Sequence, residues 1–282
     1  MEEIRNIVGN MLDSIPEPEM GPGDFVKDGL IFCGKCGMAK QKIIWIPWSK
    51  RQSKVPVTCK CRQEEMERRK QEQEFEEQMR MIQRLKDASM MDSKYRDASF
   101  DRYEVTEENR KVKAACEQYV RNFDKMYDRN QGILFYGGVG TGKSYTAACI
   151  ANALLSRKVT VIMTSFVKIM QALATTEEGE LLTRLNSAKL LILDDLGAER
   201  KTEYALEKVY NVIDSRSRAS KPMILTTNLK IGEMMDTADI GYRRVYDRIF
   251  ETCYPLEVPG QSFRIRAAER RFDDMKALME EK

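Results

Sequence analysis

A glycine-rich segment, from Gly137 to Ser144, constrains the fold of this chain more than any other feature of its sequence. Its letters, GGVGTGKS, fit the pattern G-x-x-x-x-G-K-[ST], in which glycines let the backbone wrap around a phosphate and turn its N–H groups inward. An apolar run over residues 133–136 precedes the segment, and a helical pattern over residues 145–156 follows it. This order aims the positive N-terminus of a helix at a bound phosphate. The segment therefore predicts a nucleotide site on a strand–loop–helix unit.

The positions of this segment have distinct expected roles. The ammonium group of Lys143 reaches the β- and γ-phosphates, and the hydroxyl group of Ser144 binds Mg²⁺. A chance match to the pattern is expected in roughly one chain in a hundred of this length. The residues expected to contact ATP and Mg²⁺ are Gly137, Gly138, Val139, Gly140, Thr141, Gly142, Lys143, Ser144 and Tyr145.

Strand-like and helical patterns alternate through the second half of the chain. This alternation predicts an α/β fold with a parallel five-stranded sheet and crossover helices. The expected strands cover residues 133–136, 160–164, 190–194, 223–227 and 254–258, and the expected helices cover residues 143–156, 166–174, 203–219 and 242–250.

Polar side chains follow two of these expected strands. The run over residues 190–193 is apolar throughout, which is typical of a strand covered on both faces, and it leads into Asp194 and Asp195. We expect Asp194 to hold Mg²⁺ and Asp195 to polarise the attacking water, although aspartates also cap helices and turns. Asn228, after the strand over residues 223–227, is expected to orient that water or to bind the γ-phosphate, unless it serves as a simple turn.

A group of arginines lies on the last predicted helix of this region. Arg243, Arg244 and Arg248 form either a solvated face or a source of positive charge for the γ-phosphate of a neighbouring subunit. Arg264 and Arg266 follow in the tail, where residues 264–281 are expected to form an amphipathic helix.

In this order, the motifs resemble those of AAA+ ATPases of the bacterial helicase-loader type, the DnaC/DnaI-like group that includes the IstB transposition ATPases. The resemblance covers roughly residues 95–270. It rests on the segments FYGGVGTGKS (135–144), LDDLG (193–197), LTTNL (225–229) and VYDRI (245–249).

The resemblance implies roles for further residues. Asn228 matches the sensor 1 position, Arg264 matches the sensor 2 position, and Arg248 matches the arginine finger that completes the site of an adjacent subunit. Thr202 and Tyr204 fall where the loader group contacts single-stranded DNA. An exposed aromatic ring suits that role because bases stack on it regardless of sequence, whereas the alternative for Tyr204 is helix packing.

The sequence departs from the AAA+ pattern in two respects. The second acidic residue is usually glutamate, whereas here it is Asp195, whose shorter side chain bears on the rate of hydrolysis. The chain also ends soon after Arg264, so the expected helical lid is minimal.

Four cysteines near the N-terminus form two closely spaced pairs, Cys33-x-x-Cys36 and Cys59-x-Cys61. Two such pairs on tight turns predict a tetrahedral Zn–S₄ site, which is structural because protein ligands fill all four positions. A redox pair and unlinked buried cysteines are the alternatives. The other cysteines, Cys116, Cys149 and Cys253, lie in expected core elements and are interpreted as small hydrophobic residues.

The sequence predicts four parts: an N-terminal segment (1–28), a hairpin-built zinc module (29–61), a charged linker helix (62–94) and the AAA+ domain (95–282). The apolar stripe of the linker, Phe75, Met79 and Ile82, indicates either a solvated helix or a short partner-binding stripe. By resemblance, the N-terminal part engages the replicative helicase. A nucleic-acid face is the alternative, formed by Trp45, Trp48, Lys50, Arg51 and Lys54.

Composition narrows the remaining possibilities. The chain has no histidine, which excludes a histidine base, ligand or pH switch. Its N-terminus lacks a signal-peptide pattern, and no run approaches 18 apolar residues, so no contact with a membrane is expected. Seven cysteines without a secretory signal favour a reducing, cytoplasmic location. The formal charge of +3 is too small to indicate nucleic-acid binding by itself.

The expected function is ATP-dependent loading of the replicative DNA helicase. It includes binding of ATP, Mg²⁺ and single-stranded DNA, self-association through the ATP sites, and hydrolysis of ATP to ADP and phosphate. The alternatives are an IstB-type transposition-helper ATPase and a nucleotide-gated adaptor with little hydrolysis.

Overall fold

The computed structural model describes residues 18–47, 50–199 and 202–280. The chain forms two compact units, divided between Met79 and Arg80. Trp48 and the first 17 residues of the predicted N-terminal segment lie outside the described residues. The predicted four-part division remains a prediction.

The N-terminal unit contains two small antiparallel hairpins. Strand β1 (Phe25–Lys27) pairs with β2 (Leu30–Phe32), and β3 (Gln41–Ile46) pairs with β4 (Arg51–Pro56). In the second hairpin Ile43 lies opposite Lys54 and Trp45 lies opposite Gln52. Side chains alternate between the faces of a strand, so these four share one face, and all four are exposed.

A long charged helix, α2 (Lys60–Ala88), follows the hairpins. Ion pairs at i, i+4 spacing run along it, including Arg69 with Glu65 at 2.6 Å. Such pairs support a solvated helix by a few tenths of a kcal/mol each. The helix begins two residues before the predicted start at residue 62. On its predicted apolar stripe, the Phe75 side chain is exposed.

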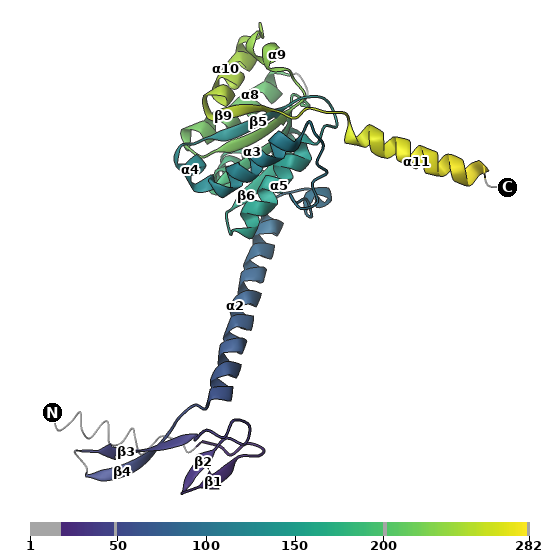
Figure 1. The fold of residues 1–282 in the computed structure, drawn as a ribbon. Helices are drawn as coiled ribbons and strands as arrows, with labels where there is room; N and C mark the ends of the chain where they lie inside the picture. The colour runs from purple at the N-terminus through teal and green to yellow at the C-terminus, as the bar shows by residue number, and fades with distance from the viewer. Residues whose placement is uncertain (1–17, 48–49, 200–201, 281–282) are drawn as a thin grey trace. The chain divides into compact units, whose positions relative to one another are not determined.

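The second unit is built on a sheet of parallel strands in the order β6-β7-β8-β5-β9 within the described residues. These strands all lie close to their predicted positions, and the sheet confirms the predicted fold class (Figure 1). The order places β5 beside β8, and β7 on the other side of β8, so the motif-bearing strands end at one edge. The bounds are β5 Gly132–Tyr136, β6 Val161–Ser165, β7 Leu190–Leu196, β8 Met223–Thr227 and β9 Cys253–Glu257.

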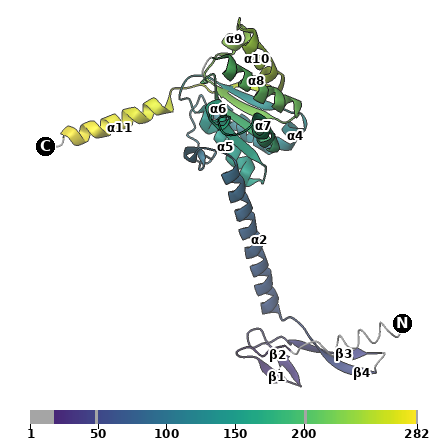
Figure 2. The same cartoon turned by 180° about the vertical axis from the view of Figure 1, so that it is seen from behind.

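Helices cover both faces of this sheet (Figure 2). One face packs against α3 (Arg110–Arg121), α4 (Phe123–Asp128) and α5 (Lys143–Ser156). The other face packs against helices that follow β6, β7 and β8, namely α6 (Phe166–Ala172), α7 (Glu178–Ser187), α8 (Glu203–Arg218), α9 (Ile231–Met235) and α10 (Ile240–Thr252).

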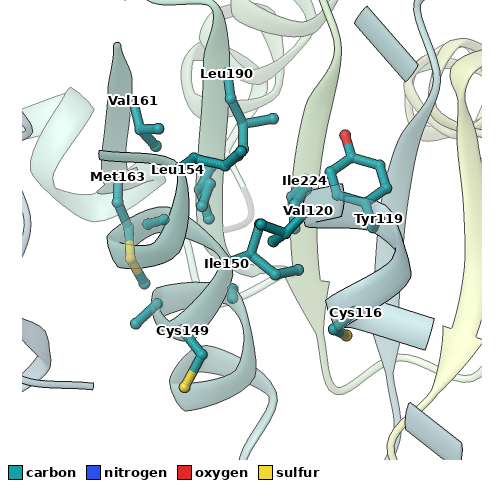
Figure 3. Packing of buried hydrophobic residues seen from close by; sticks show 14 of the residues in the cluster. Cys116, Tyr119, Val120, Cys149, Ile150, Leu154, Val161, Met163, Leu190 and Ile224 are labelled. Carbon is teal, nitrogen blue, oxygen red and sulfur yellow. The ribbon is translucent and has the colours of Figure 1, made fainter. Parts of the chain in front are cut away.

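The apolar core divides cleanly between the two faces because successive strand residues point to opposite sides. Ile133 and Phe135 of β5 join the cluster with α3 and α5, whereas Leu134 joins the opposite cluster. Figure 3 shows the first cluster, in which Cys116 and Cys149 lie among apolar side chains. Cys253 is also buried, so the interpretation of these three cysteines as small hydrophobic residues is confirmed.

Several elements were not predicted from the sequence. Helices α3, α4, α7 and α9 and a 3₁₀ turn, η1 (Ser93–Tyr95), belong to this unit. Helix α7 buries Leu181 and Leu185 among polar residues, which leaves a weak periodic signal. The C-terminal helix α11 (Phe263–Glu280) agrees with the predicted tail helix. Within the described part of the chain, none of the helices has the length and apolar character needed to cross a membrane.

Candidate functional site

The glycine-rich segment forms a tight loop between β5 and α5. Gly137 and Gly140 have φ angles of 137° and 79°, which side-chain-bearing residues rarely adopt. A Cβ atom on Gly137 would lie 2.6 Å from the carbonyl oxygen of Val258, and one on Gly140 would lie 2.1 Å from Oγ of Ser262. The loop is therefore held close to the segment that follows β9. Its backbone has the shape of a phosphate cradle, which fits a nucleotide.

Lys143 begins helix α5 and is buried, with 5% of its surface exposed. Its ammonium group donates to the carbonyl oxygens of Gly137 at 3.0 Å and Gly138 at 2.6 Å, and to Oδ1 of Asn228 at 2.7 Å. Burial lowers the pKa of Lys143, while the carboxylates of Asp195 and Asp194 oppose that shift. A phosphate oxygen is a stronger acceptor than a carbonyl, so this ammonium group is placed to bind phosphate.

Asp194 lies near the C-terminal end of β7, next to Ser144. Oδ1 of Asp194 accepts a hydrogen bond from the Thr226 hydroxyl at 2.7 Å. Burial raises the pKa of Asp194, and hydrogen bonds from the hydroxyls of Thr226 and Ser144 oppose that shift. A divalent cation would stabilise the ionised carboxylate, and Ser144 and Asp194 supply the oxygen ligands that Mg²⁺ prefers.

Asp195 occupies a turn of unusual backbone geometry. Its φ angle is 58°, and the pairing of β7 with β8 is irregular between Leu193 and Leu196. The N–H group of Asp195 donates to the Thr226 hydroxyl at 2.9 Å. Thr226 is fully buried, so this one hydroxyl fixes the backbone of Asp195 and the carboxylate of Asp194 together. Thr226 lies in the motif LTTNL, but no role for its hydroxyl was predicted.

A cavity of about 450 Å³ opens beside the loop and brings most of the predicted site residues together. Gly137, Gly138 and Thr141 shape the loop, with the Thr141 hydroxyl donating to the carbonyl of Gly138 at 3.1 Å. The predicted residues that line the cavity are Val139, Gly140, Gly142, Lys143, Ser144, Tyr145, Asp195, Asn228 and Arg264.

One wall of the cavity was not predicted from the sequence. It includes Tyr95, Arg102, Tyr103 and Glu104, from the segment before α3. The hydroxyl groups of Tyr103 and Thr146 are 2.8 Å apart and hydrogen-bonded, which fixes this segment against α5. The segment has no regular pattern, so the sequence offered no signal for it beyond its aromatic residues.

The chain after β9 forms a second wall. The N–H group of Val258 donates to the carbonyl of Tyr136 at 2.8 Å, and that of Phe263 donates to the carbonyl of Gly140 at 2.9 Å. Phe263 and Arg264 both line the cavity. The predicted sensor 2 residue, Arg264, therefore lies beside the phosphate loop of its own chain.

Other predicted residues lie elsewhere. Arg248 on α10 does not line this cavity; its guanidinium group lies 3.0 Å from Glu251 and 3.5 Å from Asp214. Thr202 caps α8 by accepting a hydrogen bond from the N–H of Ala205 at 3.2 Å. Tyr204 is 56% exposed.

The ammonium group of Lys208 lies over the ring of Tyr204. Nζ of Lys208 lies 5.1 Å from the ring centroid, and it also pairs with Glu178 at 2.8 Å and Glu207 at 2.9 Å. The exposed ring suits stacking with a base. The two carboxylates, however, offset the positive charge of Lys208.

The four N-terminal cysteines converge in the first unit. Their Sγ atoms all lie within 4.8 Å of one another, and a tetrahedral Zn–S₄ site requires sulfur atoms about 3.8 Å apart. Backbone N–H groups of Met38 and Cys61 lower the pKa of Cys36 to about 6, whereas the neighbouring Cys59 and Cys33 raise the pKa of Cys61 to about 12, so a bound cation would be needed to hold all four as thiolates. The donors and their spacing therefore fit a structural zinc ion.

One anchor of this cluster was missed in the sequence. Asp24 accepts hydrogen bonds from the N–H groups of Gly34, between the first two cysteines, at 3.0 Å and of Gly21 at 2.7 Å. Its carboxylate also pairs with Lys40 at 2.5 Å, and this bond, with those from Gly34 and Gly21, lowers the pKa of Asp24 to about 2. Asp24 therefore holds the turn that presents Cys33 and Cys36.

The sequence of this chain is similar to those of known proteins. The model of the family described as IstB-like ATP binding protein matches residues 56–271. The replicative helicase loader DnaC of Escherichia coli (strain K12) is 31% identical over 183 residues, which are 62% of this chain and 72% of that protein.

Two solved structures share the fold. A crystal structure of DnaI is similar over 61% of this chain and 93% of its own, with a TM-score of 0.51 and 23% identity. A putative primosome component from Streptococcus pyogenes serotype M3 is similar over 63% of this chain and 96% of its own, with a TM-score of 0.53 and 20% identity.

Proposed function

This chain belongs to the family of IstB-like ATP-binding proteins, in the DnaC/DnaI-like group of AAA+ ATPases, and we propose that it loads the replicative DNA helicase in an ATP-dependent manner. One observation carries the proposal. A chain that is 31% identical to a replicative helicase loader brings Lys143, Asp195 and Asn228 to one cavity beside a phosphate loop.

In this proposal the loop from Gly137 to Ser144 binds the triphosphate of ATP. Lys143 donates to the β- and γ-phosphates; two of its donors are already turned into the loop, toward Gly137 and Gly138, and the third meets Asn228. Ser144 and Asp194 hold Mg²⁺, which neutralises charge that develops on the phosphates. Burial of Asp194 supports this role, because an uncompensated carboxylate is costly there.

Hydrolysis of ATP to ADP and phosphate is the second element of the proposal. Asp195 polarises the attacking water, and Asn228 orients it beside Lys143. The hydrogen bond from the Asp195 N–H to Thr226 fixes the turn, which favours a defined position for the shorter carboxylate. Turnover of purified protein measures this directly, and an Asp195→Asn variant is expected to lose about 100-fold or more in rate.

A neighbouring subunit completes the site in this proposal. Arg248 lies outside the cavity of its own chain, which suits a residue that reaches the γ-phosphate of an adjacent copy. Arg264 acts within its own chain. Mixing Arg248→Ala protein with Lys143→Ala protein tests the arrangement: activity recovered above that of either variant alone supports it, and no recovery at any ratio argues against it.

Single-stranded DNA is proposed to lie along the surface that carries Thr202 and Tyr204. A Tyr204→Ala variant should bind a fluorescein-labelled thymidine oligonucleotide about 10-fold more weakly in an anisotropy titration, because one stacking interaction is lost. Tyr204→Phe keeps the ring and serves as the matched control. Equal affinity of the alanine variant and the parent protein would remove this surface from the proposal.

We further propose that the N-terminal unit engages the helicase. Ile43 and Trp45 lie on one exposed face of the β3–β4 hairpin, which supports contact with a protein surface. Zinc held by Cys33, Cys36, Cys59 and Cys61 would keep that unit folded. Trp45 and Lys54 on the same face leave a nucleic-acid contact as the alternative.

The loading function is tested by capture of a partner. Tagged protein with ATP should retain the hexameric replicative helicase of the same cell, and an Ile43→Asp variant should retain less.

The family model that matches this chain is named for IstB, and this favours a transposition helper as the second candidate. Retention of a transposase in place of the helicase would support that candidate and contradict the loader. An adaptor with little hydrolysis predicts helicase capture with negligible turnover.

A further inference from the structure

An ion pair joins two walls of the nucleotide cavity, the segment before α3 and the segment after β9. Nη1 of Arg266, in the first turns of α11, lies 3.5 Å from Oε1 of Glu104, in the segment before α3. Glu104 itself lines the cavity, as does Phe263, three residues before Arg266. The pair therefore connects segments more than 150 residues apart in the sequence at one edge of the cavity.

Arg266 is held in place by more than this pair. Its guanidinium carbon lies 4.3 Å from the ring centroid of Phe263, a cation–π contact. Its Nε atom is buried and, among the described residues, has no hydrogen-bond partner. A second carboxylate, Glu108, also feels its positive charge: backbone and Thr106 hydrogen bonds lower the pKa of Glu108 first, and Arg266 adds to that shift.

The contacts of Phe263 transmit this arrangement to the phosphate loop. Its N–H group donates to the carbonyl of Gly140 at 2.9 Å. A Cβ atom on Gly142 would lie 3.5 Å from its ring, so the ring packs directly on the loop. Separation of Arg266 from Glu104 would leave each wall held by its own bonds, Phe263 to Gly140 and Tyr103 to Thr146, but would remove the ion pair that ties the two walls to each other.

We propose that Arg266 and Glu104 form a latch that closes the two walls over a bound nucleotide and slows its release. Arg266 is a positioning residue in this proposal, distinct from Arg264, which lines the cavity itself. The inference rests on the proposed function, because it assumes that the loop from Gly137 to Ser144 binds ATP.

The expected effect is modest because the pair is partly solvated. The side chains of Arg266 and Glu104 are 29% and 56% exposed. An exposed pair of this kind changes an equilibrium by about threefold, and salt weakens it. We therefore expect the dissociation rate of a nucleotide to rise about threefold when either charge is removed, with little change in the association rate.

The experiment is a stopped-flow chase of a fluorescent ATP analogue, mant-ATP, from the full chain with excess unlabelled ATP and Mg²⁺. The variants are Arg266→Gln, Glu104→Gln and the double variant. Glu107→Gln removes a nearby exposed carboxylate of the same segment and is the matched control. Both single variants should release mant-ATP about threefold faster, the double variant should match them, and the control should match the parent protein.

Two readouts separate a latch from a general structural effect. Rising sodium chloride should speed release from the parent protein and leave the Arg266→Gln variant nearly unchanged. Dissociation rates of the single variants that equal the parent rate, or that multiply in the double variant, would overturn the latch. If the parent protein fails to bind mant-ATP, or binds it as tightly with Lys143→Ala, the proposed nucleotide site fails, and the latch with it.

Discussion

The two compact units of this chain are stabilised in different ways. In residues 80–282, side chains of the central strands are buried on both faces, and residues 190–193 of β7 are fully buried. In residues 1–79, the described hairpins bury Ile31 and Ile46 together with Cys33 and Cys59, whereas Phe25 and Trp45 are exposed. Burial of apolar surface can stabilise residues 80–282. In residues 1–79 the buried apolar surface is too small to stabilise the unit alone.

The two candidate sites therefore differ in how much they contribute to the folding of their units. The nucleotide site lies at the ends of strands that fold without it, so a site residue can be changed while the sheet remains. The cysteine cluster, by contrast, joins the turn after β2 to the start of α2 and thereby supplies the missing core. We therefore expect that zinc binding at this cluster and folding of the N-terminal unit are one event.

The largest effect should come from zinc removal. Zinc binding contributes about 10–16 kcal/mol in small zinc modules, so a chelator or a Cys59→Ser substitution should unfold the N-terminal unit. Both tryptophans of the chain, Trp45 and Trp48, belong to this part of the sequence, so their emission reports on it alone. The anisotropy of this emission should fall, because the exposed Trp45 ring gains mobility when the hairpin unfolds, while helix ellipticity and mant-ATP binding of residues 80–282 remain.

The opposite pattern would contradict the comparison. Unchanged tryptophan anisotropy after complete removal of zinc would show that the hairpins fold without metal. A loss of mant-ATP binding in the same sample would show that the second unit depends on the first. Cys116→Ser is the control, because Cys116 lies in the core of the second unit.

A core truncation in the sheet should have the second-largest effect. Phe135 of β5 is fully buried, and Phe135→Ala should lower the free energy of unfolding of residues 80–282 by about 4 kcal/mol. Urea unfolding followed by ellipticity measures this change, while tryptophan emission should keep its parent midpoint. A common shift of both midpoints would mean that the units unfold together.

Removal of the buried hydroxyl group of Thr226 should have a smaller effect on stability and should mainly impair the nucleotide site. Thr226→Val keeps the side-chain shape but leaves the Asp195 N–H and the Asp194 carboxylate without their partner. We expect a loss of about 2 kcal/mol in stability and a larger fractional loss of ATP turnover than of mant-ATP affinity. Thr183→Val, on the exposed face of α7, is the control. Parent-like turnover in Thr226→Val would remove Thr226 from the site.

The smallest effect concerns the anchor of the cysteine cluster. Asp24→Asn removes the charge that pairs with Lys40 and weakens the bond to Gly34 beside the cysteines. We expect zinc affinity to fall about 10-fold, measured by competition with a coloured chelator. Asp28→Asn, at an exposed position of the same unit, is the control. Equal affinities in both variants would show that Asp24 does not orient the cluster.

Much of the second unit could be predicted from the sequence because its signals are local. The apolar run before Gly137 and the glycine spacing specify β5 and the loop, and the run over residues 190–193 specifies β7. The predicted end of β7 at residue 194 was early, because the strand continues to Leu196 through a turn at Asp195 with positive φ. A bulge of this kind depends on pairing with β8 and leaves no local pattern.

The remaining parts of the site depend on contacts between distant segments. Phe263 lines the cavity because the sheet places β9 beside β5, and Glu104 lines it because Tyr103 is bonded to Thr146 of α5; the segment of Glu104 has no motif. Asp24 was missed because its carboxylate binds backbone N–H groups, which no residue type signals. The roles of Arg248, Thr202 and Tyr204 came from resemblance and stay predictions.

The most direct test of the account is the affinity of the Lys143→Ala variant for mant-ATP. The parent protein should bind mant-ATP in the presence of Mg²⁺, and the variant should bind it about 100-fold more weakly, because the ammonium group that faces the loop is gone. The variant should keep the ellipticity and tryptophan emission of the parent. Parent-like affinity in the folded variant would contradict a nucleotide site at Gly137 to Ser144.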